Sequence, residues 1–271
     1  MLTRDDVLAA SERIEGQVRR TPLLAPADGD TVWLKCEFLQ HCGVFKTRGA
    51  FNRQLAAIER GELGEAGIVV ASGGNAGLAQ AYAARALGVR ATVFVPETAP
   101  EVKVARIERY GAEVRRAGRE YAEAYLAAVD LAEQHGAVLA HAYDQAEVAA
   151  GAGTLAEELL DDEPGIDTVV VAVGGGGLYA GVAASVRGRA RVVAVEPELI
   201  PTLHDAIAAG RPVDVDVSGV AADSLGARRV GDLAFAAQQA EPPVSVLVSD
   251  ADIVEARRRL WAEHRIASEH G

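Results

Sequence analysis

The sequence is poor in several residue types that would point to particular classes of protein. Its two cysteines, Cys36 and Cys42, are too few for a disulfide framework, so we expect free thiols in a reducing compartment. Basic residues number 27 against 39 acidic ones, and the net charge of -12 argues against nucleic acid or an anionic membrane as a partner. No apolar run approaches the roughly 20 residues of a membrane span, and the first residues lack a signal peptide's apolar region. We therefore expect a cytoplasmic protein.

Aromatic residues are also scarce, at 5%, although 49% of the 271 residues are hydrophobic. The core must therefore be built from Ala, Val and Leu, which is typical of α/β proteins. Short apolar segments alternate with segments of helical periodicity, and no internal repeat is present. This alternation predicts βαβ units in one large or two modest domains.

The expected strands are uniformly apolar, which predicts buried parallel strands without a face in water. They lie at Thr31–Cys36, Ile68–Ala71, Ala91–Val95, Thr168–Val173 and Arg191–Val195. The expected helices lie at Asp5–Arg19, Arg48–Glu59, Ala76–Leu87, Glu101–Tyr110, Glu120–Gln134, Gln145–Leu160 and Leu178–Val186. Acidic residues open the first helix and Arg19 closes it, as the helix dipole favours, while several others stop at glycine.

A first glycine loop, Ser72-Gly73-Gly74-Asn75-Ala76-Gly77, lies between an expected strand and an expected helix. Free backbone N–H groups at such a helix N-terminus can bind an anion. A substrate carboxylate would suit it, with the Ser72 hydroxyl as a donor and the Asn75 amide facing a cofactor oxygen. The alternative is a tight turn capped by Ser72 or Asn75.

A second loop, Gly174-Gly175-Gly176-Gly177, also joins an expected strand to an expected helix. Four consecutive glycines are entropically costly, which favours a site whose amides surround a phosphate over a structural turn. The spacing Gly175-x-Gly177-x-x-Ala180 also fits a dinucleotide fingerprint, with Glu196 about 20 residues on, so an NAD site is an alternative. A nucleotide P-loop is excluded because no Gly-Lys-Ser/Thr follows.

Lys46 is a residue with which both glycine loops could form a single cofactor site. It lies in the run Phe45-Lys46-Thr47-Arg48-Gly49-Ala50, just before an expected helix. A partly desolvated lysine amine can lose its proton near neutral pH and condense with a carbonyl, which is how pyridoxal phosphate enzymes hold their cofactor. Taken alone, a lysine that opens a helix is more often a solvated surface residue. The NAD alternative leaves Lys46 and the first loop without a role.

With these residues the sequence resembles the fold type II pyridoxal phosphate enzymes, in the serine/threonine dehydratase and serine racemase branch. The resemblance covers nearly the whole chain and rests on the two glycine loops and on Thr21–Leu24, Trp33–Gln40 and Phe45–Asn52. It implies two open, mostly parallel α/β domains of the tryptophan synthase beta-like kind, with the cofactor in the cleft. Residues 1–52 and 141–271 would form a large cofactor-binding domain, and residues 53–140 a small domain for the substrate carboxylate.

The resemblance also implies roles for single residues. Lys46 would be the catalytic residue and would carry the cofactor. The cofactor contacts would come from Lys46, Phe45, Asn75, Gly174, Gly175, Gly176 and Gly177, with the glycines on the phosphate and Asn75 on the ring hydroxyl oxygen. The substrate carboxylate would be held by Ser72, Gly73, Gly74, Asn75 and Ala76.

The implied activity is that of an L-threonine/L-serine dehydratase, a homodimer that gives a 2-oxo acid and ammonia. The freed Lys46 amine would remove the Cα proton, after which the β-hydroxyl leaves. Racemases of this family use a second serine at the position of Gly73, which cannot exchange a proton, so elimination is favoured over serine racemase activity. The remaining alternatives are an inactive, truncated cofactor-binding relative and an NAD-dependent oxidoreductase.

The chain departs from the family pattern at several positions. Val44 replaces a usual Ser or Thr, and Ala76 stands where His is common. Relatives continue for about one more helix and strand beyond the position of Gly271, supplying a Ser, Thr or Cys for the pyridine nitrogen, and no residue here matches that role. Relatives also bind a divalent cation. Glu196 and Glu269 align with two of its carboxylates, so Mg²⁺ or Ca²⁺ is a candidate, but Thr202 replaces the third.

Overall fold

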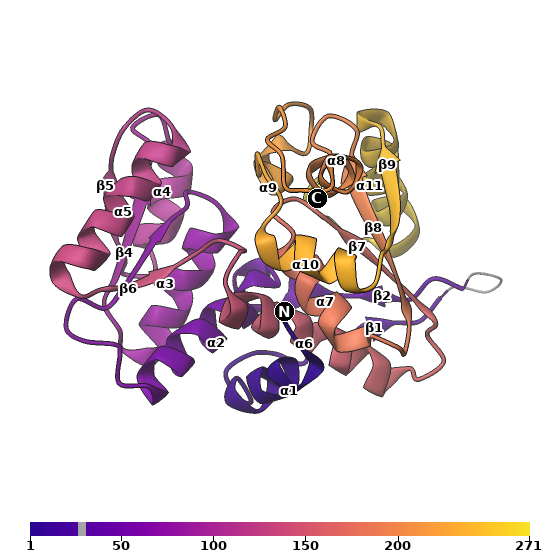
Figure 1. Cartoon of the computed structure of the whole chain (residues 1–271), viewed down its shortest axis with the longest axis horizontal. Helices are drawn as coiled ribbons and strands as arrows, with labels where there is room; N and C mark the ends of the chain where they lie inside the picture. Colours follow the sequence, from indigo (N-terminus) through magenta and orange to yellow (C-terminus); the bar gives the residue numbers. More distant parts are fainter. Residues whose placement is uncertain (27–30) are drawn as a thin grey trace.

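The computed structural model describes residues 1–26 and 31–271, and it places two parallel sheets in two lobes (Figure 1). The sheet of the first lobe has the strand order β5-β4-β3-β6, and that of the second lobe has the order β7-β8-β9. The first lobe's strands are β3 (Ile68–Ala71), β4 (Ala91–Val95), β5 (Glu113–Arg116) and β6 (Val138–Ala140). The second lobe's strands are β7 (Thr168–Ala172), β8 (Arg191–Pro197) and β9 (Val244–Val248). The predicted α/β fold with parallel sheets is confirmed.

The first lobe has helices on both faces of its sheet. Alternate side chains of β3, β4 and β6 pack on α3 (Asn75–Leu87) and α4 (Glu101–Glu108), and the others pack on α5 (Tyr121–His135). All residues of β3 and β4 are buried, which is why their sequences show no alternation. Gly88 and Gly136 take left-handed conformations just after α3 and α5, as expected of helix C-terminal caps.

The second lobe buries only one face of its sheet. Val169 and Val171 lie in the core with α7 (Gly177–Val186), α8 (Thr202–Ala209) and α10 (Asp232–Ala240). Val170 points the other way and is 66% exposed, as is Val244 at 52%. The expectation that every strand lacks a face in water is therefore wrong for this sheet. The remaining helices here are α9 (Ala222–Leu225) and α11 (Asp250–His264).

Three helices connect the lobes through glycine contacts. Helix α2 (Lys46–Glu59) packs on α6 (Ala146–Asp162). A side chain on Gly151 of α6 would lie 2.7 Å from the Cα of Gly49 in α2. Two residues further along α6, and so on a different side of the helix, a side chain on Gly153 would lie 2.5 Å from the carbonyl oxygen of Gly181 in α7. The backbones can approach this closely only because these positions lack Cβ atoms. The start of α2 is thereby fixed near the start of α7, while α2 also packs on α3 of the first lobe.

The N-terminal region differs from the sequence prediction. Helix α1 (Arg4–Arg13) ends before Arg19, because Gly16 is left-handed and the backbone of Arg19 bonds instead to the side chain of Gln40. The strand expected at Thr31–Cys36 is reduced to β2 (Leu34–Lys35), which pairs antiparallel with β1 (Leu23–Leu24) rather than parallel. Two short 3-10 turns, Glu37–Leu39 and His41–Gly43, follow it.

Candidate active site

Lys46 is the first residue of α2, and its side chain is half-buried. Nζ donates to the carbonyl oxygen of Ala142 at 3.4 Å and lies 5.0 Å from the centre of the Phe45 ring. Burial lowers the pKa of the Lys46 ammonium from 10.5 to about 8, and the negative charge of Glu269 opposes that shift. With a pKa of about 8, the amine is neutral in a minority of molecules near neutral pH but far more often than an ordinary lysine, and the neutral form is the one that nucleophilic and proton-transfer chemistry require.

The other two lysines of the chain are occupied by carboxylates. Lys35 pairs with Glu158 at 2.6 Å, and Lys103 pairs with Asp223. In the part of the chain that the structure describes, Lys46 alone among the lysines forms no ion pair. Lys46 is therefore the lysine best suited to react with an aldehyde.

The tetraglycine loop precedes α7 and offers unpaired donors. Gly176 has a φ of 86°, and among the described residues no acceptor is bonded to the N–H groups of Gly174, Gly175, Gly176 or Gly177. Unpaired amides at a helix N-terminus are suited to bind an anion. A small cavity of about 10 Å³ is lined by Gly177, the last residue of this loop, and by Phe45 and Lys46, so the end of the loop and the lysine border the same cavity.

Glycine is required in this loop for space. A side chain on Gly175 would lie 2.3 Å from the Tyr143 ring, and one on Gly177 would lie 2.5 Å from the Tyr143 carbonyl oxygen. At Gly176 it would lie 2.4 Å from the Cβ of Ala234. The loop is thus pressed between the segment after β6 and helix α10, which fixes the direction of its amides.

The first glycine loop connects β3 to α3. The N–H of Gly74 donates to Oγ of Ser72 at 3.3 Å, and the turn is so tight that a side chain on Gly77 would lie 2.0 Å from the Ser72 carbonyl oxygen. Asn75 begins α3, and its Nδ2 donates to Oε2 of Glu269 at 2.8 Å. In the described chain Ser72, Gly73, Gly74 and Ala76 make no hydrogen bond to Lys46 or to the tetraglycine loop, so their substrate roles stay predictions.

An aromatic cluster beside Lys46 was not anticipated. Tyr121 and Tyr125 of α5 stack, Tyr125 meets the His141 ring edge-on, and His141 meets Tyr143 in the same way at 4.7 Å. Burial lowers the pKa of His141, and its Nδ1 accepts the Asp144 N–H at 2.8 Å, so the ring is neutral with its proton on Nε2.

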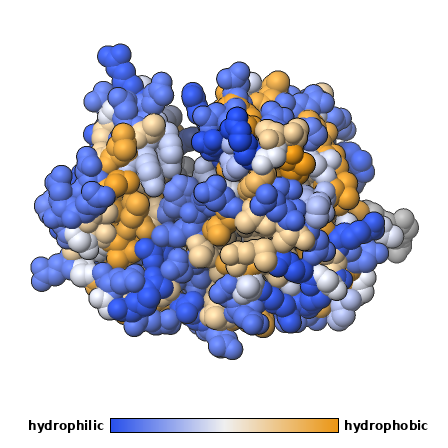
Figure 2. All heavy atoms as spheres, in the orientation of Figure 1, coloured by the Kyte–Doolittle hydropathy of each residue, from blue (hydrophilic) through white to orange (hydrophobic). Residues whose placement is uncertain are grey.

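His141 and Tyr143 of this cluster border a cavity of about 540 Å³. Its lining includes His141, Tyr143, Arg211 and Arg229. On this face of the molecule Figure 2 shows a notch between the two lobes, with strongly hydrophilic residues on the side of the second lobe. Residues 141–144 follow β6, the strand next to β3, and so lie at the same carboxyl edge of the sheet as Ser72, but β6 is too short to be recognised in the sequence.

The two glutamates predicted to bind a cation are engaged elsewhere. Glu196 is fully buried, and its carboxylate accepts the N–H groups of Leu203 and His204 at 2.7 and 2.8 Å, so it caps α8. Burial raises the pKa of Glu196, although the hydrogen bonds that its carboxylate accepts act in the opposite direction. Glu269 accepts from Asn75. No group of three or more His, Cys, Asp or Glu side chains suited to a metal occurs in residues 1–26 or 31–271, and the metal role stays a prediction.

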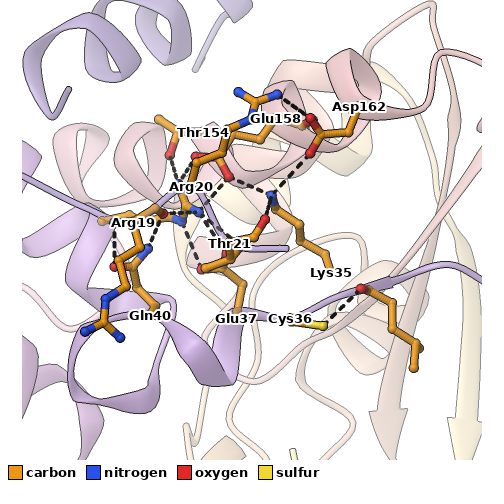
Figure 3. Close-up of polar contacts among 12 residues, drawn as sticks. Arg19, Arg20, Thr21, Lys35, Cys36, Glu37, Gln40, Thr154, Glu158 and Asp162 are labelled. Carbon is orange, nitrogen blue, oxygen red and sulfur yellow. Dashed lines mark hydrogen bonds and ion pairs between the residues drawn. The ribbon is translucent and has the colours of Figure 1, made fainter. Parts of the chain in front are cut away.

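A buried ionic network holds the first turn of α2. Arg48, with no exposed surface, donates to both oxygens of Glu37 and to both oxygens of Glu158 at 2.7 to 2.9 Å. Lys35 donates to the same Glu158, and Thr21 to Glu37 (Figure 3). Two cations thus meet two carboxylates out of water, an arrangement that is stable only when every partner is present. The network joins α2 to α6 and to the N-terminal hairpin.

Known proteins resemble this chain in sequence and in structure. A family model described as "Pyridoxal-phosphate dependent enzyme" matches residues 14–270. L-threonine ammonia-lyase of Geobacter sulfurreducens is 36% identical over 94% of this chain, and this chain spans 63% of its length. L-threo-3-hydroxyaspartate ammonia-lyase of Pseudomonas sp is 37% identical, over 93% of this chain and 81% of the relative. The structure of maize serine racemase superposes with a TM-score of 0.92 at 30% identity, over 99% of this chain and 83% of that one.

The chain therefore belongs to the pyridoxal-phosphate dependent enzymes, and its cofactor is pyridoxal phosphate. The residues present fit that group, since the unpaired amides of the tetraglycine loop suit a phosphate and the amine of Lys46 suits an aldehyde. The family match favours this cofactor over the dinucleotide that the glycine spacing also allowed. No helix within the described ranges is long and apolar enough to cross a membrane.

Proposed function

We propose that the protein is an ammonia-lyase that converts L-threonine or L-serine to the corresponding 2-oxo acid and ammonia. The observation that carries the proposal is the cavity lined by Lys46, Phe45 and Gly177 of the tetraglycine loop, beside which burial lowers the pKa of the Lys46 amine to about 8. The 36% identity to an L-threonine ammonia-lyase supports the same substrate.

Different residues of this chain have separate roles in binding and in proton transfer. The amides of Gly174–Gly177 hold the cofactor phosphate, and the Ser72 loop holds the substrate carboxylate. When bound, pyridoxal phosphate supplies a conjugated ring that stabilises the electron pair left at Cα. Nζ of Lys46 takes the Cα proton, and loss of the β-hydroxyl follows. Asn75 orients the ring through its hydroxyl oxygen. Gly73 offers no side chain to a proton on the opposite face of Cα, which favours elimination over racemisation.

L-threo-3-hydroxyaspartate is a second candidate substrate. One relative is named for it, and its extra carboxylate needs a cation near the site. Arg211 and Arg229 line the cavity next to Tyr143, and Arg211 makes no side-chain ion pair within the described ranges. A preference for this substrate would therefore depend on Arg211.

The test is the formation of 2-oxo acid and ammonia by purified protein from L-threonine, L-serine and L-threo-3-hydroxyaspartate, in wild type and Lys46→Ala. We expect equal amounts of the two products from wild type and at least about a 10³-fold lower rate from the variant. Lys103→Ala, which removes a lysine outside the cavity, should retain activity. A wild-type protein that binds the cofactor but turns over none of the three would contradict the proposal and indicate a cofactor-binding relative without activity.

We further propose that the protein works as a cytoplasmic homodimer. The free thiols of Cys36 and Cys42 support a reducing compartment. The exposed apolar side chains Val170, Val244 and Val246 on one face of the second sheet support association between copies. Sedimentation equilibrium on the purified protein tests the dimer, and a monomer at all concentrations would contradict it.

A further inference from the structure

The residues that follow α11 return to the site. Arg265 takes a left-handed conformation with a φ of 56°, which reverses the chain after His264. Ile266 then buries its side chain, and its N–H donates to the carbonyl oxygen of Leu260 at 3.1 Å. We call residues 265–271 the strap. In Figure 1 the strap leads to the C-terminal end beside α9.

The strap is held by contacts with both α11 and α9. Nε of Arg257 donates to the carbonyl oxygen of Ser268 at 2.8 Å, and NH1 of the same arginine lies 2.7 Å from Nε2 of His270. Gly271 packs on α9 so closely that a side chain there would lie 2.7 Å from Oγ of Ser224. The next residue of α9, Leu225, lies against Gly174 of the tetraglycine loop. The strap is therefore held against the element that supports the phosphate site.

From this fixed segment Glu269 reaches the opposite lobe. Its Oε2 accepts from Nδ2 of Asn75, the first residue of α3, at 2.8 Å, and its charge acts on Lys46. An asparagine amide has two N–H donors and one carbonyl acceptor. With one N–H committed to Glu269, the amide of Asn75 cannot rotate freely, and its second N–H and its carbonyl point in set directions.

We propose that Glu269 is a positioning residue, which orients the Asn75 amide toward the cofactor and links the two lobes across the site. The inference rests on the proposed function, because it deepens the role of Asn75 at the ring hydroxyl oxygen. A charge-assisted hydrogen bond of this kind is stronger than a neutral one, and its acceptor is fixed by Arg257 rather than carried on a free chain. Arg257 therefore acts on the cofactor through Glu269.

The first test uses apo-protein titrated with pyridoxal phosphate. Glu269→Ala should weaken cofactor binding about tenfold, as loss of one hydrogen bond to a charged group does, and Glu269→Gln should weaken it less because an amide oxygen still accepts from Asn75. The second readout is the ratio of the visible to the near-ultraviolet absorption band of the bound cofactor, which depends on the hydrogen bond to the ring hydroxyl oxygen. Glu269→Ala should change this ratio in the same direction as Asn75→Ala.

Two further variants separate positioning from general stability. The double variant Asn75→Ala/Glu269→Ala should bind the cofactor no more weakly than Asn75→Ala alone, because Glu269 acts through that amide. Arg257→Met should reproduce part of the Glu269→Ala change in the band ratio. Glu263→Gln removes an exposed carboxylate on α11 that pairs with the exposed Arg259 and lies 3.9 Å from the half-buried His264, and it should leave both readouts unchanged.

The outcomes distinguish this inference from the proposed function. If wild-type protein binds no pyridoxal phosphate, the proposed function itself fails. If wild type binds it and Glu269→Ala matches wild type in affinity and band ratio, the positioning role is wrong while the function stands. Fully additive losses in the double variant would also overturn it, since they would mean that Glu269 acts without Asn75.

Discussion

Arg48 makes two parallel hydrogen bonds to Glu158, at 2.7 and 2.9 Å, only two residues after Lys46. This pair fixes the first turn of α2 to α6, and with it the direction from which the Lys46 amine enters its cavity. The reactive group is thus held by a rigid, buried ionic network rather than by a loop. Stability and activity should therefore depend on the same few side chains.

Glu158→Gln should lower the free energy of unfolding by about 3 to 5 kcal/mol, because it leaves the buried charges of Arg48 and Lys35 without their shared partner. Urea unfolding of the apo-proteins measures the change. The matched control is Glu263→Gln, which removes one side of an exposed i,i+4 pair and should cost at most about 0.5 kcal/mol. Equal effects of the two substitutions would show that the network contributes no more than a surface ion pair.

Attachment of the cofactor to apo-protein should become faster as pH rises through about 8, the pKa of Lys46, and level off above it, since only the neutral amine attacks an aldehyde. Stopped-flow absorbance of apo-protein mixed with pyridoxal phosphate gives the rate constant at each pH. A rate constant that keeps rising to the ordinary lysine pKa of 10.5 would mean that the amine is solvated.

The lowered pKa of Lys46 should also make the free energy of unfolding of the apo-protein depend on pH. Below pH 8 Lys46 is protonated in both states, and the folded protein carries the full cost of burying the charge. Between about 8 and 10.5 the unfolded chain binds more protons than the folded one, so the contribution of Lys46 to the free energy of unfolding rises with pH. The difference in unfolding free energy between wild type and Lys46→Met, followed across this range, isolates the effect. A constant difference would contradict the lowered pKa.

Gly176→Ala should weaken binding of pyridoxal phosphate by at least about tenfold, because the new methyl group meets Ala234 and forces the loop amides out of line. Gly188→Ala is the control. Gly188 has a φ of 69°, comparable with the 86° of Gly176, but no atom lies within 4 Å of a side chain placed there. It should lose about 1 kcal/mol of stability from its backbone conformation and keep its cofactor affinity. Equal affinities for both variants would mean that the loop does not hold the phosphate.

Ser72→Ala should raise KM for the amino acid about tenfold and change kcat less, because a donor to the substrate carboxylate contributes to binding in the ground state and the transition state alike. Steady-state kinetics with the preferred substrate give both constants. An unchanged KM would place the substrate carboxylate elsewhere.

The sequence allows prediction of those elements whose residues share one environment. Strands β3 and β4 match their expected limits because both faces are buried, which makes every residue apolar. Strand β5 (Glu113–Arg116) was missed because it lies at the sheet edge with charged, exposed side chains. Strand β6 has only three residues, too few for a pattern. Helix α1 was predicted too long because Arg19, interpreted as its closing charge, lies beyond the left-handed Gly16 and bonds through its backbone to the Gln40 side chain.

In the site, too, the residues that belong to local sequence patterns could be predicted and those set by tertiary contacts could not. Lys46 and the two glycine loops belong to local patterns with a stated chemistry, and they could be proposed from the sequence. The bond from Asn75 to Glu269 joins positions 194 residues apart, and no local pattern marks either side chain for the other. Tyr143 and His141 were missed because their strand was missed. Long-range contacts of this kind come from packing, which periodicity and spacing do not encode.

The most direct test of the account is the visible spectrum of the purified protein before and after borohydride, followed by peptide mapping of the reduced adduct. The chain has three lysines, so the map has three possible outcomes. We predict a yellow band that disappears on reduction and a stable adduct on Lys46. A protein that takes up no pyridoxal phosphate, or an adduct on Lys35 or Lys103, would contradict the assignment of Lys46 as the residue that holds the cofactor.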